Sequence, residues 1–162
     1  MVLEVGCGMG RNLKPLSMRF PKMIGLDISP KMIELAGEYL AGRNNVKLGL
    51  ISDTGKYPLV NACVDLAFSV ITFQHMPSRE VVVGALSEVK RVLKAKGLFR
   101  VQTHVGDPPQ PGTYRGVCGY FYPSAEAFAE EVRGVGLKVV SLKQVKLALP
   151  GDPQWIWLTA RK

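Results

Sequence analysis

The segment Leu3–Gly10 constrains the fold of this chain more than any other. It reads LEVGCGMG, a short apolar stretch with an acid, followed by Gly6, Gly8 and Gly10 at every second position. Glycine lacks a Cβ atom, so the chain can turn sharply there and a ligand can approach the backbone. Residues 11–20 can form a helix, which would aim backbone N–H groups of the turn at a ligand. The segment therefore predicts a nucleotide-binding turn at the top of an α/β sheet.

The spacing of the glycines indicates which nucleotide the turn would bind. A dinucleotide fingerprint places a third glycine where the helix packs closely on the strand, and that position holds Arg11. Here the glycines alternate instead, and Glu4 stands two residues before Gly6. This pattern resembles the first motif of class I S-adenosylmethionine-dependent methyltransferases, of the methyltransferase type 11-like kind. Because glycine turns are common, a plain strand–helix turn is the alternative for this motif alone.

A second strand that ends in an acid follows at Met23–Ile28. Its acid, Asp27, can accept two hydrogen bonds from a ribose diol, as the matching acid does in dinucleotide folds. Ser29 and Pro30 then begin a helix, with a hydroxyl N-cap and a proline in the first turn. The resemblance implies that Asp27 holds the ribose and that Ile28 lies against the adenine. A solvated turn residue is the alternative for Asp27.

Two further strands complete the resemblance around the expected cofactor site. Residues 46–50 read as a strand, and a polar break that contains Asp53 and Thr54 follows. The resemblance implies that Asp53 lies near the adenine amino group, whose N–H a carboxylate accepts well, with Thr54 beside it. It also implies that Ser69, in the strand 65–71, lines the pocket. Finally, it implies that Glu4 and the three glycines hold the methionine end of the cofactor.

The remaining chain alternates between helix and strand patterns until residue 102, which predicts a doubly wound, mostly parallel α/β sheet. Residues 104–123 break this rhythm. The last two strands, 137–145 and 154–160, are joined by a short turn and should pair antiparallel. The methyltransferase fold also ends with an antiparallel last strand. The other expected elements are a helix at 78–93, a strand at 97–102 and a helix at 124–133.

Methyl transfer from a sulfonium needs an aligned acceptor, exclusion of water and, for some acceptors, a base. The chain has two histidines, and both follow strands at the carboxyl edge of the expected sheet. His75 is the candidate base, with a structural role in its loop as the alternative. The long loop after the fifth strand would grip the substrate. Its candidate substrate-binding residues are His104, Tyr114, Arg115 and Tyr120, with packing of the aromatic rings on the core as the alternative.

Length and composition fit one globular domain over residues 1–162. Hydrophobic residues make up 47% of the chain, and no apolar run approaches the roughly 20 residues that span a bilayer. No secretory signal is recognisable at the start, so we expect no membrane partner. Three widely separated cysteines argue for a reducing cytoplasm, and no metal site is expected.

The net charge of +8 raises the question of a nucleic-acid partner. The cations are scattered, and the one cluster, Lys90–Lys96, reads as a solvated face on the far side of the sheet. The motifs for methylation of exocyclic base amines or of cytosine C5 are missing after the fourth strand. The sequence therefore predicts methyl transfer from S-adenosylmethionine, leaving S-adenosylhomocysteine, to an O, N or C atom of a small molecule. A nucleic-acid or protein acceptor stays open.

One departure from the family concerns the first strand. Relatives usually carry helices before it that close over cofactor and substrate, whereas this chain begins inside that strand. We therefore expect an N-terminally short domain: either the start was assigned too far downstream, or the lid is missing or comes from another subunit, as in a homodimer. A catalytically inactive cofactor-binding module is a further alternative, and a nicotinamide enzyme is disfavoured by Arg11.

Overall fold

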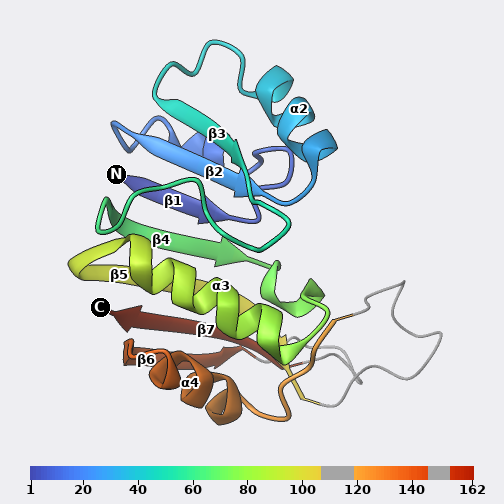
Figure 1. The fold of residues 1–162 in the computed structure, drawn as a ribbon, viewed down its shortest axis with the longest axis vertical. Coiled ribbons are helices and arrows are strands. Elements are labelled where there is room, and N and C mark those ends of the chain that lie inside the picture. Colours follow the sequence, from blue (N-terminus) through green and yellow to red (C-terminus); the bar gives the residue numbers. More distant parts are fainter. Residues whose placement is uncertain (107–118, 146–153) are drawn as a thin grey trace.

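The computed structural model describes residues 1–106, 119–145 and 154–162. In this part of the chain, seven strands form one sheet in the order β3-β2-β1-β4-β5-β7-β6 (Figure 1). The strands are β1 (Val2–Val5), β2 (Met23–Asp27), β3 (Val46–Leu50), β4 (Val64–Val70), β5 (Leu93–Val105), β6 (Lys138–Val145) and β7 (Gln154–Arg161). The helices are α1 (Leu13–Leu16), α2 (Pro30–Tyr39), the 3-10 turn η1 (Phe73–His75), α3 (Arg79–Val92) and α4 (Ala125–Gly134).

The pairing confirms the expected doubly wound, mostly parallel α/β sheet. The first five strands run parallel to their neighbours, whereas β7 is antiparallel to both β5 and β6. The chain winds outward from β1 to β3 and then returns to the other side of β1 with β4. This reversal makes the carboxyl edge of β1 and β4 a topological switch point, where open α/β sheets bind ligands.

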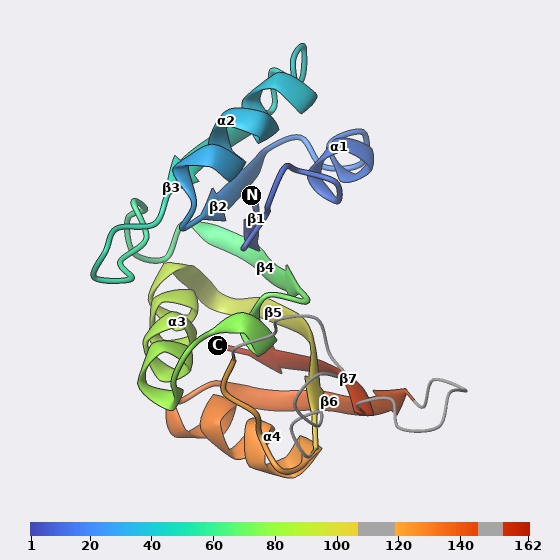
Figure 2. The same ribbon diagram turned by 90° about the vertical axis from the view of Figure 1, so that its right-hand side faces the viewer.

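Helices cover the sheet on two faces, as the alternating sequence pattern requires. Helices α1 and α2 lie on one face, and α3 and α4 lie on the other (Figure 2). The helical spacing of apolar residues predicted in the segment 78–93 is confirmed, because α3 buries Val82, Leu86, Val89 and Val92 against β5 and α4. No described helix has the length and apolarity to cross a bilayer.

Serine side chains begin the three longer helices, as expected for two of them from the sequence. Ser29 Oγ accepts a hydrogen bond from Met32 N at 3.3 Å, and Ser124 Oγ accepts one from Ala127 N at 3.1 Å. Ser78 plays the same part for α3. Each cap satisfies a backbone N–H that has no partner inside its helix.

Two expected elements differ in the structure. Residues 11–20 form only one helical turn, Leu13–Leu16, because the next carbonyls bond elsewhere. Asn45 Nδ2 donates to the carbonyls of Ser17 and Phe20, which ends the helix. The fifth strand is longer than the predicted 97–102 at both ends, because Leu93 pairs with Val64 of β4 and β7 pairs with the strand as far as Val105. His104 therefore lies inside β5 rather than after it.

Candidate functional site

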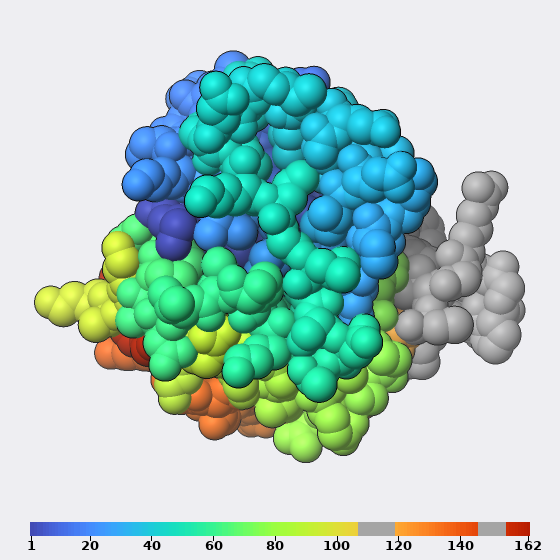
Figure 3. Space-filling view, turned by 45° about the horizontal axis from the view of Figure 1, so that its top comes forward, coloured from blue at the N-terminus to red at the C-terminus, as the bar shows by residue number. Residues whose placement is uncertain are grey.

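A cavity of about 770 Å³ opens at the carboxyl edge of the sheet, at the switch point. The ends of β1 and β2, the connection from β3 to β4, the residues around η1 and one side of α3 line it. The connection, residues 51–63, lies between the N-terminal strands and the surface of α3 in the space-filling view, where it is teal to green (Figure 3). The cavity is thus bounded by segments that are far apart in the sequence.

The glycine turn leaves room for a ligand at the rim of this cavity. Gly6 has φ +72°, and a Cβ atom there would lie 2.2 Å from the Thr72 side chain. Only glycine therefore fits between the turn and the residue that follows β4. Gly8 has φ +51°, and a Cβ atom there would meet nothing within 4 Å. Open space above a bare backbone is the arrangement that the alternating glycines predict.

Asp27 connects the glycine turn to the end of β2. Its Oδ2 accepts a hydrogen bond from Gly8 N at 2.8 Å, and its Oδ1 accepts one from Ser29 N at 2.9 Å. The side chain is mostly buried and lines the cavity. Because each carboxylate oxygen has a second lone pair, Asp27 can still accept two hydrogen bonds from a ligand diol.

Glu4 lies behind the turn and is almost completely buried, with 1% of its surface exposed. Asn12 Nδ2 donates to Glu4 Oε1 at 2.7 Å, whereas Oε2 has no hydrogen-bond partner in the described part of the chain. Burial raises the pKa of Glu4 to about 7; the Asn12 hydrogen bond opposes this shift and the charge of Asp27 adds to it. Glu4 is thus a buried acid that titrates near neutral pH.

The adenine side of the expected site consists of exposed residues on the cavity rim. Ile28 lines the cavity with 66% of its surface exposed, which leaves an apolar side chain free for a flat ligand to cover. Asp53 and Thr54 also line the cavity, and Thr54 Oγ1 lies 2.9 Å from Ser52 Oγ. The structure thus brings Gly6, Asp27, Ile28, Asp53 and Thr54 to one cavity.

Other residues of the expected cofactor site lie outside this cavity. Ser69 is fully buried, and its Oγ donates to the Val5 carbonyl at 2.8 Å, so it fastens β4 to the end of β1. Gly10 faces Leu40 instead, because a Cβ atom built on Gly10 would lie 2.8 Å from Leu40 Cδ1. Gly8 adjoins the cavity through its hydrogen bond to Asp27, whereas neither Glu4 nor its partner Asn12 lines the cavity.

The two histidines differ in their surroundings. His75 lines the cavity and is exposed, and partial desolvation lowers its pKa, which favours the neutral imidazole that a base needs. His104 is buried inside the sheet, where its ring stacks on Phe121 at 5.3 Å and meets the edge of Trp155 at 5.2 Å. The structure therefore separates His104 from the cavity.

The remaining substrate candidates are only partly placed. Tyr120 N donates to the Met76 carbonyl at 2.7 Å, which sets Tyr120 beside a cavity residue. Its ring meets that of Tyr122 edge to face, with centroids 5.0 Å apart. Tyr114 and Arg115 lie outside the described residues.

Sequence reasoning missed several cavity residues. Thr72 fills the space beside Gly6, and its Oγ1 donates a hydrogen bond to the Gly6 carbonyl at 3.3 Å. Tyr57 and Glu88 line the cavity and are hydrogen-bonded to each other. One signal in the sequence could have pointed to Glu88: it stands three residues before Arg91 on a helix, a spacing that allows an ion pair. This spacing does not indicate which other segment the pair would contact.

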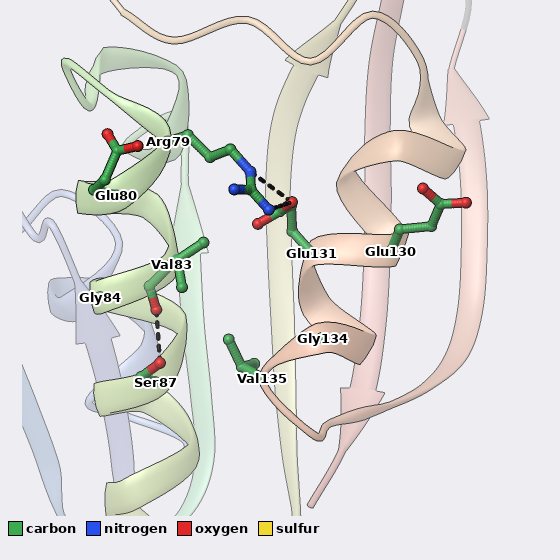
Figure 4. Close-up of a pocket in the computed structure, with 9 residues that line it drawn as sticks. All are labelled: Arg79, Glu80, Val83, Gly84, Ser87, Glu130, Glu131, Gly134 and Val135. Carbon is green, nitrogen blue, oxygen red and sulfur yellow. Dashed lines mark hydrogen bonds and ion pairs between the residues drawn. The ribbon is translucent and has the colours of Figure 1, made fainter.

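A second hollow, of about 590 Å³, lies between α3 and α4 (Figure 4). Arg79 of α3 bridges it, with Nη2 donating to Glu131 of α4 at 2.6 Å. This hollow contains none of the expected cofactor or substrate residues. In the described ranges, no group of three or more His, Cys, Asp or Glu side chains could hold a metal ion.

Comparison with known sequences identifies relatives of part of this chain. A malonyl-[acyl-carrier protein] O-methyltransferase from Ilyobacter polytropus is 41% identical over 75 residues, covering 45% of this chain and 27% of the relative. A sterol 24-C-methyltransferase from Gibberella zeae is 33% identical over 104 residues, covering 62% of this chain and 26% of the relative. The chain spans between 26% and 37% of the length of the curated relatives it matches.

Comparison with solved structures extends over nearly the whole chain. The [4+2]-cyclase SpnF superposes with a TM-score of 0.81 at 20% identity, covering 99% of this chain and 74% of that one. An S-adenosylmethionine-dependent methyltransferase from Aquifex aeolicus superposes with a TM-score of 0.75 at 24% identity, covering 99% and 80%. These similarities establish the fold.

The family is established by a sequence model. A family model described as a methyltransferase domain matches residues 2–97, which is more than half of the chain. The matched segment contains the glycine turn, Asp27 and the connection between β3 and β4, and it includes every residue that lines the cavity. This chain therefore belongs to the methyltransferase-domain family.

Proposed function

We propose that the cavity at the carboxyl edge binds S-adenosylmethionine and that a small molecule accepts the methyl group at an O, N or C atom. The observation that carries this proposal is the setting of Asp27. Its carboxylate is fixed by two backbone N–H groups, lines the cavity and adjoins the open space above Gly8. Such an acid is preorganised to receive a ribose diol beside a bare backbone turn.

The other residues fit the remaining parts of this cofactor. Ile28 offers an exposed apolar surface to the adenine ring, and Asp53 offers an acceptor for its amino group. Glu4 and the glycine turn adjoin the methionine end. Glu88 is neutralised by Arg91, but three further acids line the cavity against one lysine, which favours a cationic ligand: Asp27, Asp53 and Glu80 against Lys56.

The bound cofactor supplies a methyl group on a sulfonium, whose departure leaves a neutral thioether. The task of the chain is therefore to bind, to orient and to exclude water. His75 lines the cavity with a lowered pKa, so it can accept a proton from an acceptor hydroxyl or amine at neutral pH.

A small acceptor is supported by the cavity and by the relatives. The cavity of about 770 Å³ falls in the range of small-molecule sites, which hold roughly 300–1,000 Å³. The named relatives act on a sterol and on a malonyl group carried by a protein. A nucleic-acid acceptor is the second candidate, favoured by the net charge of +8. Binding of RNA that falls steeply with salt would support that second candidate.

Isothermal titration calorimetry with S-adenosylmethionine and S-adenosylhomocysteine tests the proposal. We expect both to bind the full chain and Asp27→Ala to weaken binding by about a hundredfold, since two hydrogen bonds to a charged group are lost. Glu38→Ala, which removes an exposed acid of α2, is the control and should bind like the parent chain. Equal binding by Asp27→Ala would remove Asp27 from the site.

A further inference from the structure

The connection between β3 and β4 forms one wall of the cavity, although it has no regular secondary structure. Residues 51–63 contain no helix and no strand, yet Asp53, Thr54 and Tyr57 all line the cavity. Within this segment, Ser52 accepts a hydrogen bond from Gly55 N at 2.8 Å, which closes only a local turn. The position of this wall relative to the sheet must therefore come from contacts outside the segment.

Backbone hydrogen bonds fasten the two ends of the segment, from Ile51 N to the Asp27 carbonyl at 2.9 Å and from Cys63 N to the Val92 carbonyl at 2.8 Å. Between these ends, the side chains of two α3 residues, Glu88 and Arg91, bind the segment. Glu88 Oε2 accepts a hydrogen bond from Tyr57 N at 2.7 Å. Arg91 donates to the carbonyls of Leu59 at 2.7 Å and Tyr57 at 3.1 Å, and to Asn61 Oδ1 at 2.8 Å. The two α3 residues thus hold the connection at the backbone of Tyr57 and Leu59 and at the side chain of Asn61.

The same two residues also hold each other. Arg91 Nε and Nη2 each donate to one Glu88 carboxylate oxygen at 2.7 Å, a two-point ion pair. Both side chains are shielded, with 18% and 23% of their surfaces exposed. The phenol ring of Tyr57 is buried beneath them, and its hydroxyl lies 3.4 Å from the Ala85 carbonyl. A guanidinium with all these acceptors around it has one geometry, which a lysine cannot reproduce.

We propose that the Glu88–Arg91 pair is a positioning element for the cofactor: it fixes residues 57–61 against α3 and thereby holds Asp53 and Thr54 where the adenine is recognised. The inference rests on the proposed function, because its expected consequence is a change in affinity for the proposed cofactor. When the pair is broken, the wall samples other positions, and the apparent Kd rises by the inverse of the competent fraction. Neither residue touches the reacting atoms in this account.

Arg91→Lys tests the inference, with Arg79→Lys as the matched control. Arg79 also lies on α3 and donates through Nε and Nη2 to one carboxylate, that of Glu131 (Figure 4). Its hydrogen bonds therefore reach α4 rather than the connection between β3 and β4. Calorimetry with S-adenosylhomocysteine should give a Kd about tenfold higher for Arg91→Lys. The Kd of Arg79→Lys should stay within about twofold of the parent value.

Amide hydrogen exchange of the ligand-free chain, measured on peptides by mass spectrometry, separates positioning from general stability. For Arg91→Lys, exchange should accelerate in peptides from residues 52–61 while peptides from β1 and β4 keep the parent rates. If Arg91→Lys fails to fold, Glu88→Gln serves as the second variant, because glutamine keeps an oxygen acceptor for Tyr57 N but loses the charge that pairs with Arg91. Parent-like exchange in residues 52–61 together with a parent-like Kd would overturn the inference. If the parent chain itself binds no S-adenosylhomocysteine, the proposed function fails, and exchange alone decides whether the pair holds the wall.

Discussion

Glu4→Gln gives the most quantitative test of the buried acid behind the glycine turn. In the folded chain the pKa of Glu4 is raised from 4.5 to about 7 by burial. The folded state therefore binds more protons than the unfolded state between these two values. The contribution of Glu4 to stability is then lost as the pH rises from the unfolded pKa through the folded one.

The size of the effect follows from the shift. A difference of one pKa unit is worth about 1.4 kcal/mol, so charging Glu4 in its buried position costs roughly 3 kcal/mol in all. Most of this cost, about 2–3 kcal/mol, falls between roughly pH 5 and pH 8. Glutamine keeps the acceptor for Asn12 Nδ2 and cannot ionise, so the variant avoids this cost.

Urea unfolding of the two proteins at pH 5, 6, 7 and 8 measures the effect. We expect the unfolding free energy of Glu4→Gln, relative to the parent, to rise by about 2–3 kcal/mol over this range. Glu38→Gln, an exposed acid on α2, should show a difference that does not vary with pH. A Glu4→Gln difference that also stays constant would refute the reasoning, because Glu4 would then titrate as in an unfolded chain.

Three further substitutions probe the turn and its surroundings. Gly6→Ala should destabilise the chain by at least about 2 kcal/mol in urea unfolding, since its Cβ would meet Thr72 and its φ is positive. Thr72→Ala in the same background should recover part of that loss. Ser69→Ala should cost about 1 kcal/mol for the lost bond to Val5 while leaving the Kd for S-adenosylhomocysteine unchanged, and a changed Kd would place Ser69 at the cofactor. NMR titration of His75 should give a pKa below its ordinary 6.5, and a higher value would argue against its role as a base.

The sequence located the cavity because its signals are local. Glycines with positive φ and an acid at a strand end are read directly from neighbouring residues, and Gly6 and Asp27 lie where these signals indicated. Parallel strands bring such turns to one edge of the sheet, so the order of elements predicted their meeting. That Glu4, Ser69 and the other residues act on the cofactor stays a prediction, as does a single domain over residues 1–162.

What sequence reasoning missed depends on contacts between distant segments. The carboxyl end of β5, and with it the burial of His104, is set by pairing with β7 about fifty residues later. The hydrogen bond of the buried Ser69 hydroxyl to the Val5 carbonyl was not foreseen either, because the two residues are 64 positions apart in the chain. The pairing of Glu88 with Arg91 could be foreseen on α3, whereas their grip on Tyr57 and Leu59 could not, because those residues reach α3 only through the folded chain.

A crystal structure of the chain with S-adenosylhomocysteine would test the central claim most directly. We predict the nucleoside in the cavity of the carboxyl edge, with its ribose hydroxyls on the Asp27 carboxylate and its adenine over Ile28. A ligand bound elsewhere, or a ribose that makes no contact with Asp27, would contradict this account.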